Sequence, residues 1–460
     1  MSTIKLEKKL FGTNGVRGIV GKDLTPDNVL AIGQSLGTMR KGRIAVGRDT
    51  RTSGEVFIKA IKAGLLATGC DIVDCGILPT PALQYIVKEY FDGGAMITAS
   101  HNPPEYNGVK IIESDGTEMG DEETVQLETI LFDRSFSTQP WDKIGHEISA
   151  PYLLEEYIRA ITSKFPGKPG DGMTVVVDPG SGPACITTPR ILTEMGCKVI
   201  TINGIMDGTF PGRLPEPSVD GLRNLSELVK NSGAAFGVAH DGDADRAVFI
   251  DDKGEFVEEN QEFALITRHI CHDKQGIIVT PVSTGQIVEI IARQQNCCLE
   301  YTPVGSIYVA RTMRRLIEQG KTVVFGGEGN GGLIFPEHQF CRDGGMTAAV
   351  MVKVLKSTGK SLSDIVHDLP KRYIIKDKIA IKNGRQLLKS IKASYSQDTI
   401  DETDGIKIFR GDMWALIRAS GTEPIVRFII DSDEKDKGIH FHAELKMCIE
   451  DFIQKQKSLS

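Results

Sequence analysis

Three times along this chain, an apolar segment flanked by glycine runs directly into a polar loop. The three segments read GGAMITASHNP at 93–103, GAAFGVAHDGDADR at 233–246 and GKTVVFGGEGNGG at 320–332. A short apolar run bounded by glycine predicts a buried strand. Ligands of open α/β sheets bind outside the carboxyl ends of the strands. The repeat therefore predicts three related domains whose loops contribute to one cleft.

The rest of the chain fits this architecture. Helical patterns and short β-rich segments alternate over about the first 355 residues, which predicts α/β domains with largely parallel strands. The last part instead shows alternating strands and one terminal helix over about 442–455, which predicts a smaller α+β domain. A chain of 460 residues is too long for one core, so we expect three or four domains. Candidate boundaries lie at 149–151, 252–254 and 369–370.

The composition excludes several classes of protein. With 40% hydrophobic and 25% charged residues the chain is globular, and its net charge of -7 argues against a nucleic-acid surface. No apolar run reaches membrane-spanning length, and MSTIKLEKKLFG lacks a signal-peptide core, so we expect a cytoplasmic protein that does not bind membranes. The nine cysteines form no CxxC pair, which predicts free thiols rather than zinc ligands or disulfides.

Asp241, Asp243 and Asp245 form the strongest candidate site. Alternate residues of an extended segment point the same way, so three carboxylates converge and repel unless a cation lies among them. Hard oxygen ligands suit magnesium. An EF-hand would need glycine and glutamate where Arg246 and Asp252 stand, so a calcium loop of that kind is excluded.

Ser100 and His101 follow the predicted strand 95–98. A serine exposed on a strand-end loop can act as a nucleophile, although Ser-His in a turn is commonly just turn chemistry. No G-x-S-x-G elbow is present, so a serine hydrolase has no support. Lys110 lies one short strand downstream, where it either returns to the cleft or remains on the surface.

The sequence GEGNGG at 327–332 matches G-x-G-x-x-G, but the proline-containing LIFPEHQF after it does not predict an opening helix. Dinucleotide binding is therefore not indicated. The glycines would instead let Glu328 and Asn330 approach a ligand, and their side chains suit recognition of sugar hydroxyls. The alternative is a tight glycine-rich turn.

RASGTEP at 418–424 follows another predicted strand. Backbone amides in such a turn, together with Arg418, Ser420 and Thr422, predict a phosphate cradle, and Arg427 could add charge. Gly359-Lys360-Ser361 is not a Walker A motif, because Val354 stands where its first glycine is required. Nucleotide use is therefore unsupported.

Taken together, these motifs resemble the α-D-phosphohexomutase superfamily. The matching pieces are FGTNGVRG at 11–18, TASHNPPEYNGVK at 98–110, DGDADR at 241–246, GEGNGG at 327–332 and RASGTEP at 418–424. The resemblance implies four domains around a central cleft, three of them related mixed α/β sheet domains and the last an α+β domain. We expect them at 1–151, 152–253, 254–369 and 370–460.

The resemblance also implies roles for the motif residues. Ser100 would carry the phosphoryl group, and one Mg²⁺ would be bound by a serine-phosphate oxygen and the three aspartates. Positions around the transferring phosphate are matched by Arg17, His101, Lys110 and Arg246. The sugar-reading loop is matched by Glu328 and Asn330, and the clamp on the non-reacting phosphate by Arg418, Ser420, Gly421 and Thr422.

The implied reaction interconverts sugar 6-phosphate and 1-phosphate through a bisphosphorylated sugar. FGTNGVRG favours glucosamine phosphate, and a phosphomannomutase/phosphoglucomutase of the same mechanism is the alternative. Gly331-Gly332 and Asn330 depart from the Gly-His and Ser of many bacterial relatives, so the sugar is left open. A non-catalytic sugar-phosphate-binding protein and a magnesium phosphatase are the competing classes. The expected partner is a phosphosugar, and a homodimer is left open.

Overall fold

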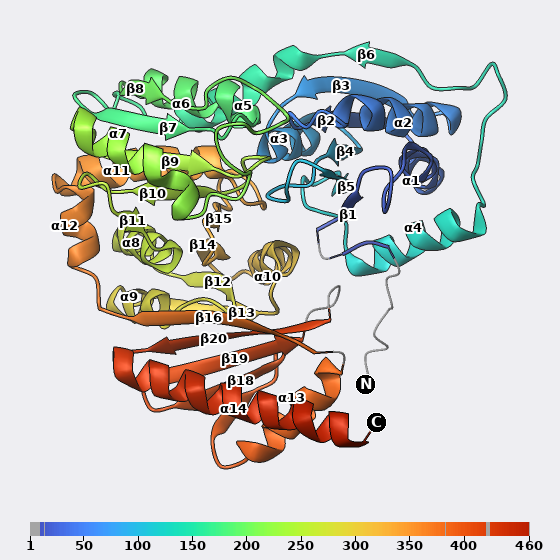
Figure 1. Cartoon of the computed structure of the whole chain (residues 1–460). Coiled ribbons are helices and arrows are strands. Elements are labelled where there is room, and N and C mark those ends of the chain that lie inside the picture. Colours follow the sequence, from blue (N-terminus) through green and yellow to red (C-terminus); the bar gives the residue numbers. More distant parts are fainter. Residues whose placement is uncertain (1–9, 13, 382, 420–423, 460) are drawn as a thin grey trace. The chain divides into compact units, whose positions relative to one another are not determined.

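The computed structural model describes residues 10–12, 14–381, 383–419 and 424–459, with backbone only for 457–459. Two compact units share the chain. The first comprises Met1–Glu262 and Asn330–His367, and the second Phe263–Gly329 and Asp368–Ser460. Each unit is built from sheets covered by helices (Figure 1). Among the described residues, no helix has the length and apolar character needed to cross a bilayer.

The first sheet of the first unit has six strands in the order β1-β5-β4-β2-β3-β6. The bounds of its strands are β1 Val16–Ile19, β2 Arg43–Arg48, β3 Asp71–Ile77, β4 Gly93–Ile97, β5 Tyr106–Glu113 and β6 Glu147–Ser149. Strand β2 pairs in parallel with β3 and β4, whereas β5 is antiparallel to both β4 and β1. The neighbouring helices are α1 Pro26–Met39, α2 Gly54–Ala67, α3 Thr80–Tyr90 and α4 Asp121–Asp133.

Helix α1 begins at Pro26, directly after its N-cap residue Thr25. Thr25 and Asn28 form a reciprocal capping box, which satisfies amides that the first helical turn leaves without partners. The helix then packs closely on α2 through two glycines. A Cβ atom at Gly33 would lie 2.5 Å from the carbonyl oxygen of Ile61, and one at Gly64 would lie 2.3 Å from that of Leu30.

The second sheet of the first unit has the order β11-β10-β9-β7-β8. The bounds of its strands are β7 Thr174–Asp178, β8 Lys198–Thr201, β9 Phe236–His240, β10 Ala247–Ile250 and β11 Phe256–Val257. Strand β7 is parallel to β8 and β9, and β9 and β10 form an antiparallel hairpin. The remaining helices and strand of this unit are α5 Leu154–Thr162, α6 Thr188–Glu194, α7 Arg223–Ser232, β15 Gly332–Ile334, α11 Gly344–Thr358 and α12 Leu362–His367.

In the second unit, β12 pairs in parallel with β13 and β14. The elements of this part are β12 Ile277–Pro281, α9 Gln286–Gln294, β13 Cys298–Thr302, α10 Ser306–Glu318 and β14 Val323–Glu328. Helix α8, Glu259–Asp273, leads into it. The proline-containing sequence after β14 predicts that no helix opens there, and the structure confirms this, since strand β15 follows.

The C-terminal part of the second unit is an antiparallel sheet of order β16-β20-β19-β18-β17. Its elements are β16 Tyr373–Ala380, α13 Gly384–Ser394, β17 Thr399–Asp401, β18 Ile406–Arg410, β19 Met413–Ala419, β20 Ile425–Ser432 and α14 Lys435–Leu459. A core that includes Leu387, Phe428 and Leu445 joins α13 and α14 to the sheet.

The predicted fold class is confirmed: α/β sheets are followed by an α+β domain. Some elements were predicted incompletely. The terminal helix begins at Lys435 rather than near 442, because its first turns are polar and carry little apolar periodicity. Helix α13 and strand β17 were not predicted. The exact domain boundaries stay a prediction.

Candidate active site

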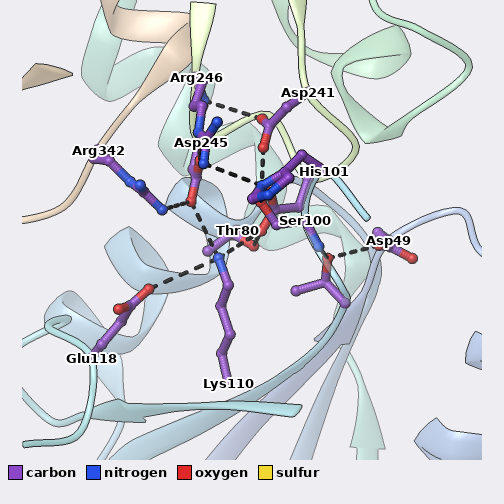
Figure 2. Close-up of polar contacts among 12 residues, drawn as sticks. Asp49, Thr80, Ser100, His101, Lys110, Glu118, Asp241, Asp245, Arg246 and Arg342 are labelled. Atoms are coloured by element: carbon purple, nitrogen blue, oxygen red, sulfur yellow. Dashed lines mark hydrogen bonds and ion pairs between the residues drawn. The ribbon is translucent and has the colours of Figure 1, made fainter. Parts of the chain in front are cut away.

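Ser100 lies in the loop between β4 and β5 (Figure 2). Its side chain is buried, and its backbone has a φ of 51°. A left-handed conformation at a residue other than glycine costs of order 1–3 kcal/mol and is concentrated at functional sites. The backbone amide of Ser100 donates to the Thr98 hydroxyl at 2.9 Å. The fold therefore supports a strained serine at a strand end.

The Ser100 side chain points at the aspartate turn. Its hydroxyl donates to Oδ2 of Asp241 at 2.9 Å, and its Oγ lies 3.4 Å from Nδ1 of His101. The backbones also meet, since a Cβ atom at Gly242 would lie 2.3 Å from the Ser100 carbonyl oxygen. Two loops far apart in sequence thus form one site.

Asp241, Asp243 and Asp245, here called the aspartate cluster, occupy the turn of the β9–β10 hairpin. All three are buried, and one ligand oxygen from each lies within 4.8 Å of the others. Ala244, between two of the aspartates, has a φ of 60°. The left-handed residue lets the turn reverse while the carboxylates converge, so the predicted alternation is realised as a tight turn rather than an extended strand.

Cationic side chains neutralise part of the negative charge of the cluster. Lys110 on β5 donates to Oδ2 of Asp243 at 2.8 Å and to Oδ2 of Asp245 at 3.2 Å. Arg342 donates to the same oxygen of Asp245 at 2.5 Å, and the Thr80 hydroxyl donates to Asp243 at 2.6 Å. Lys110 therefore returns to the site and is not a surface lysine.

The carboxyl groups of the cluster differ in pKa. Burial raises the pKa of Asp241 well above its usual range, and Asp245 and Asp243 raise it further. Burial acts in the same direction on the other two, but Lys110 holds the pKa of Asp243 below its usual range, and Arg342 does so for Asp245. Among the described residues, Arg246 is the cation that lowers the pKa of Asp241, and it does not offset the effect of burial, which explains the split.

The cluster fits a metal ion. Oδ1 of Asp243 and Oδ1 of Asp245 are buried and accept no hydrogen bond from the described residues, although the Arg246 Nε lies 3.8 Å from the latter. A buried carboxylate oxygen without a partner is costly, and a hard divalent cation would satisfy it. The cluster could therefore bind a metal.

His101 lies beside charged side chains of both signs. Arg246 donates to its Nδ1 at 3.2 Å, and Glu216 lies 3.7 Å from the same atom. Burial, Arg246 and Arg17 together lower the pKa of His101 to about 3, so the ring is neutral at physiological pH. Arg17 on β1 donates to the Asn102 side chain at 3.0 Å. Both arginines and His101 thus lie beside the Ser100 loop.

The sequence did not point to Arg342, Thr80 or Glu118 as site residues. Arg342 directly precedes Asp343, which caps α11, and Glu118 lies 3.8 Å from the Lys110 ammonium group. A charged residue next to a helix start could have indicated Arg342. Nothing comparable marks Thr80 and Glu118, since long-range packing brings them to the cluster.

The other predicted site residues fall in different parts of the chain. Asn330 belongs to the first unit, where its Oδ1 accepts a hydrogen bond from the Gly332 amide at 3.1 Å. Glu328, Arg418 and Arg427 belong to the second unit. The predicted clamp residues outside the described part of the chain are Ser420, Gly421 and Thr422.

Within the second unit, Arg418 on β19 lies opposite Arg427 on β20 in register. Directly opposed residues share one face of the sheet, and two like charges there are unfavourable without an anion or a carboxylate. Asp404 supplies one carboxylate, 2.7 Å from Arg418, and also accepts from the Val304 amide at 2.9 Å.

Four family profiles match the chain in consecutive segments. They are described as phosphoglucomutase/phosphomannomutase alpha/beta/alpha domains I, II and III and the C-terminal domain, and they match residues 8–138, 155–254, 258–373 and 375–445. The chain is a phosphohexomutase of this family. It is accordingly an isomerase that acts by intramolecular phosphoryl transfer.

Curated relatives of this phosphohexomutase carry two kinds of name. A phosphoglucomutase/phosphomannomutase of Thermococcus kodakarensis is 42% identical over 93% of this chain and 96% of the relative. A phosphoglucosamine/phosphogalactosamine mutase of Sulfurisphaera tokodaii is 37% identical over 96% of this chain and 99% of the relative. The superfamily is thus established, and both sugar classes are represented.

Solved structures share the fold. A phosphoglucomutase/phosphomannomutase family protein from Burkholderia thailandensis has a TM-score of 0.85 at 23% identity, covering 96% of this chain and 97% of that chain. An Aspergillus fumigatus N-acetylphosphoglucosamine mutase, solved with GlcNAc-6P and magnesium, has a TM-score of 0.63 at 14% identity, covering 97% and 96%.

Proposed function

We propose that this phosphohexomutase transfers phosphoryl groups through Ser100, with Mg²⁺ held by the aspartate cluster. The observation that carries the proposal is the 2.9 Å hydrogen bond from the buried Ser100 hydroxyl to Asp241. It brings a candidate phosphoryl carrier to a candidate metal site. A phosphate on Oγ would add one more oxygen ligand to the three carboxylates of the cluster. Such an all-oxygen set suits a hard cation.

The chemistry balances in two half-reactions. A sugar-phosphate hydroxyl attacks the phosphorus on Ser100; the P–Oγ bond breaks, a sugar O–P bond forms, and the hydroxyl proton passes to Oγ. Oγ then attacks the other phosphorus of the bisphosphorylated sugar; that sugar O–P bond breaks, the P–Oγ bond forms again, and the Oγ proton passes to the sugar oxygen, so that the isomeric monophosphate leaves. A bound Mg²⁺ would neutralise charge on the phosphoryl oxygens.

The chain's own side chains would orient the transfer. Lys110 and Arg17 bring fixed positive charge beside the Ser100 loop, and Arg246 adds a third cation. A phosphate on Ser100 would attract these cations more strongly than the neutral serine does. Burial of the serine keeps water away from the phosphoryl group, which limits hydrolysis.

The non-reacting phosphate would bind the arginines of the second unit. Arg418 and Arg427 lie opposite each other on β19 and β20, and the Asp404 carboxylate lies 2.7 Å from Arg418. The clamp is proposed to include Ser420, Gly421 and Thr422. Glu328 and Asn330 are proposed to contact the sugar hydroxyls.

We further propose glucosamine phosphate as the preferred sugar, on the basis of FGTNGVRG at 11–18 and the name of the Sulfurisphaera tokodaii relative. A glucose or mannose phosphate is the second candidate, favoured by the name of the relative from Thermococcus kodakarensis. Side-by-side coupled assays of glucosamine, glucose and mannose 6-phosphates decide between them by kcat/KM. Preference for a hexose over the amino sugar would overturn the first choice.

The competing classes make different predictions in the same assays. A non-catalytic binding protein would bind the sugar phosphates without interconverting them. A phosphatase would release inorganic phosphate at rates comparable with isomerisation. Quantifying isomer and free phosphate in one reaction separates all three, and the proposed function requires isomer to exceed phosphate by a wide margin.

A further inference from the structure

Arg51 is a fully buried arginine next to the Ser100 loop, and it has no role in the chemistry above. Its guanidinium group donates to four main-chain carbonyl oxygens, three in that loop and one at the start of β5, at 2.6 to 2.9 Å. These belong to Ser100, Asn102, Pro103 and Tyr106. The Nε of Arg51 donates to Oδ2 of Asp49 at 3.1 Å. All five guanidinium N–H groups are therefore used.

The contacts of Arg51 shape the backbone at the nucleophile. Its carbonyl partners include that of Ser100 itself, whose φ of 51° is costly for a serine. The partner carboxylate, Asp49, also accepts a hydrogen bond from Thr98 at 2.7 Å, and the Thr98 hydroxyl accepts from the Ser100 amide. One Asp–Arg pair thus holds the loop on both sides of the serine.

A second Asp–Arg pair lies at the end of a strand of the other sheet in the same unit. Arg213 donates from Nε to Oδ2 of Asp178 at 2.9 Å and from a terminal nitrogen to the His240 carbonyl at 2.7 Å. His240 is the residue before Asp241. Gly180 leaves the room for this guanidinium, since a Cβ atom there would lie 2.6 Å from it.

The two pairs occupy equivalent places. Asp49 directly follows β2, which lies parallel to β4, the strand that leads to Ser100. Asp178 ends β7, which lies parallel to β9, the strand that leads to Asp241. In each sheet, an aspartate at the end of the neighbouring strand orients an arginine toward the backbone of the site loop. This correspondence also supports the internal repeat.

We propose that Arg51 and Arg213 are matched positioning residues, one holding the phosphoryl-carrier loop and the other the metal-binding turn. The inference rests on the proposed function, which assigns the phosphoryl carrier to the first loop and the metal site to the second. It assigns them separable effects: Arg51 sets the reactivity of Ser100, and Arg213 sets the geometry of the aspartate cluster.

Conservative lysine variants test this separation. Lysine keeps the charge but cannot reach several carbonyls at once. Arg51→Lys is expected to lower the rate of Ser100 phosphorylation by glucose 1,6-bisphosphate ~100-fold, because small misplacements of reacting groups have effects of that size. Its KM for sugar phosphate and its Mg²⁺ affinity should change less than about twofold.

Arg213→Lys is expected to weaken Mg²⁺ binding about 10-fold, since groups that orient metal ligands have effects of that order. Calorimetric titration with MgCl₂ measures this without turnover. Arg159→Lys on the exposed face of α5 is the matched control and should behave as the parent protein. Equal losses of both properties in both variants, or no loss in either, would overturn the proposal.

Hydrogen exchange gives a second readout. In the parent protein the amides of Ser100 and Asn102 should be protected, and Arg51→Lys should release them without releasing β9. If Arg51→Lys does not fold, Asp49→Asn replaces it, because it keeps the guanidinium and removes the carboxylate that orients it. The same slow phosphorylation is then expected, and a parental rate would overturn the proposal.

Failure of the proposed function can be distinguished from failure of the two positioning roles. If the parent protein accepts no phosphate from the bisphosphate, Ser100 is not the carrier. The positioning roles are then judged by exchange and Mg²⁺ affinity, where unchanged protection in Arg51→Lys and unchanged affinity in Arg213→Lys would overturn them.

Discussion

The Ser100 hydroxyl donates to Asp241 at 2.9 Å across 141 positions of sequence. Ser100 lies in the loop after β4 and Asp241 directly follows β9, and the sheets of these two strands belong to one compact unit. The same unit supplies Lys110, which bridges two members of the aspartate cluster. A candidate nucleophile, a cation and a candidate metal site are therefore brought together within one compact unit.

The first prediction concerns the metal. Asp243→Asn should weaken Mg²⁺ binding at least about 10-fold, because it removes the charge of a carboxylate whose Oδ1 accepts no hydrogen bond within the described part of the chain. Calorimetric titration of the purified protein measures this. Asp142→Asn, in an exposed loop, is the control and should bind as the parent protein does. Unchanged affinity in Asp243→Asn would remove this residue from the ligand set.

The second prediction links metal binding to pH. Burial raises the pKa of Asp241 in the folded protein above its value in the unfolded chain. The proton on Asp241 therefore contributes to the free energy of unfolding at low pH, and this contribution is lost as pH rises through the pKa of the folded state. Mg²⁺ needs the ionised carboxylate and displaces the proton. The increase in Tm caused by saturating MgCl₂ should therefore be larger at a pH of about 8 than at about 6.

Asp241→Asn cannot ionise and provides the control for this effect. Its smaller Mg²⁺ stabilisation should be nearly independent of pH over the same interval. A parent protein that is stabilised equally at both pH values would show that no proton is displaced from the site.

The third prediction concerns Lys110. Lys110→Met should lower the free energy of unfolding of the metal-free protein by about 3 kcal/mol, because it removes the ammonium group that contacts the buried Asp243 and leaves Asp245 with its arginine contacts alone. MgCl₂ should restore much of this loss. Lys59→Met, with an exposed ammonium group, should change stability by less than about 0.5 kcal/mol. Denaturant unfolding with and without MgCl₂ tests both, and a loss that Mg²⁺ does not reduce contradicts the account.

The fourth prediction concerns Arg418. Because the proposed clamp binds the non-reacting phosphate in every state, Arg418→Ala should mainly raise KM, with a smaller effect on kcat. Steady-state kinetics measure both. Arg293→Ala, on the exposed side of α9, is a control in the same unit. A large fall in kcat at unchanged KM would be incompatible with a clamp that does not distinguish the states.

Much of the site could be predicted from local sequence. Asp241, Asp243 and Asp245 are close in sequence, so one turn brings them together wherever the hairpin packs. Ser100 and His101 follow a recognisable buried strand. The periodic strands and the capped start of α1 likewise depend on neighbours along the chain.

Other features depend on packing between distant segments. Arg342 meets Asp245 across 97 positions, and Thr80 meets Asp243 across 163. Arg51 is an unremarkable arginine in the sequence, and only the fold shows its side chain enclosed by loop carbonyls. Local pattern therefore identifies the candidate reactive groups, whereas the residues that contact and orient these groups are identified only by tertiary contacts.

The most direct test of the central claim is the phosphorylation state of Ser100. Purified protein incubated with MgCl₂ and glucose 1,6-bisphosphate is digested, and the peptide containing Ser100 is analysed by mass spectrometry alongside turnover of glucosamine 6-phosphate. The account predicts one phosphate on Ser100, and no phosphate and no turnover in Ser100→Ala, with Ser163→Ala behaving as the parent. Sustained turnover by Ser100→Ala, or phosphate on another residue, would contradict it.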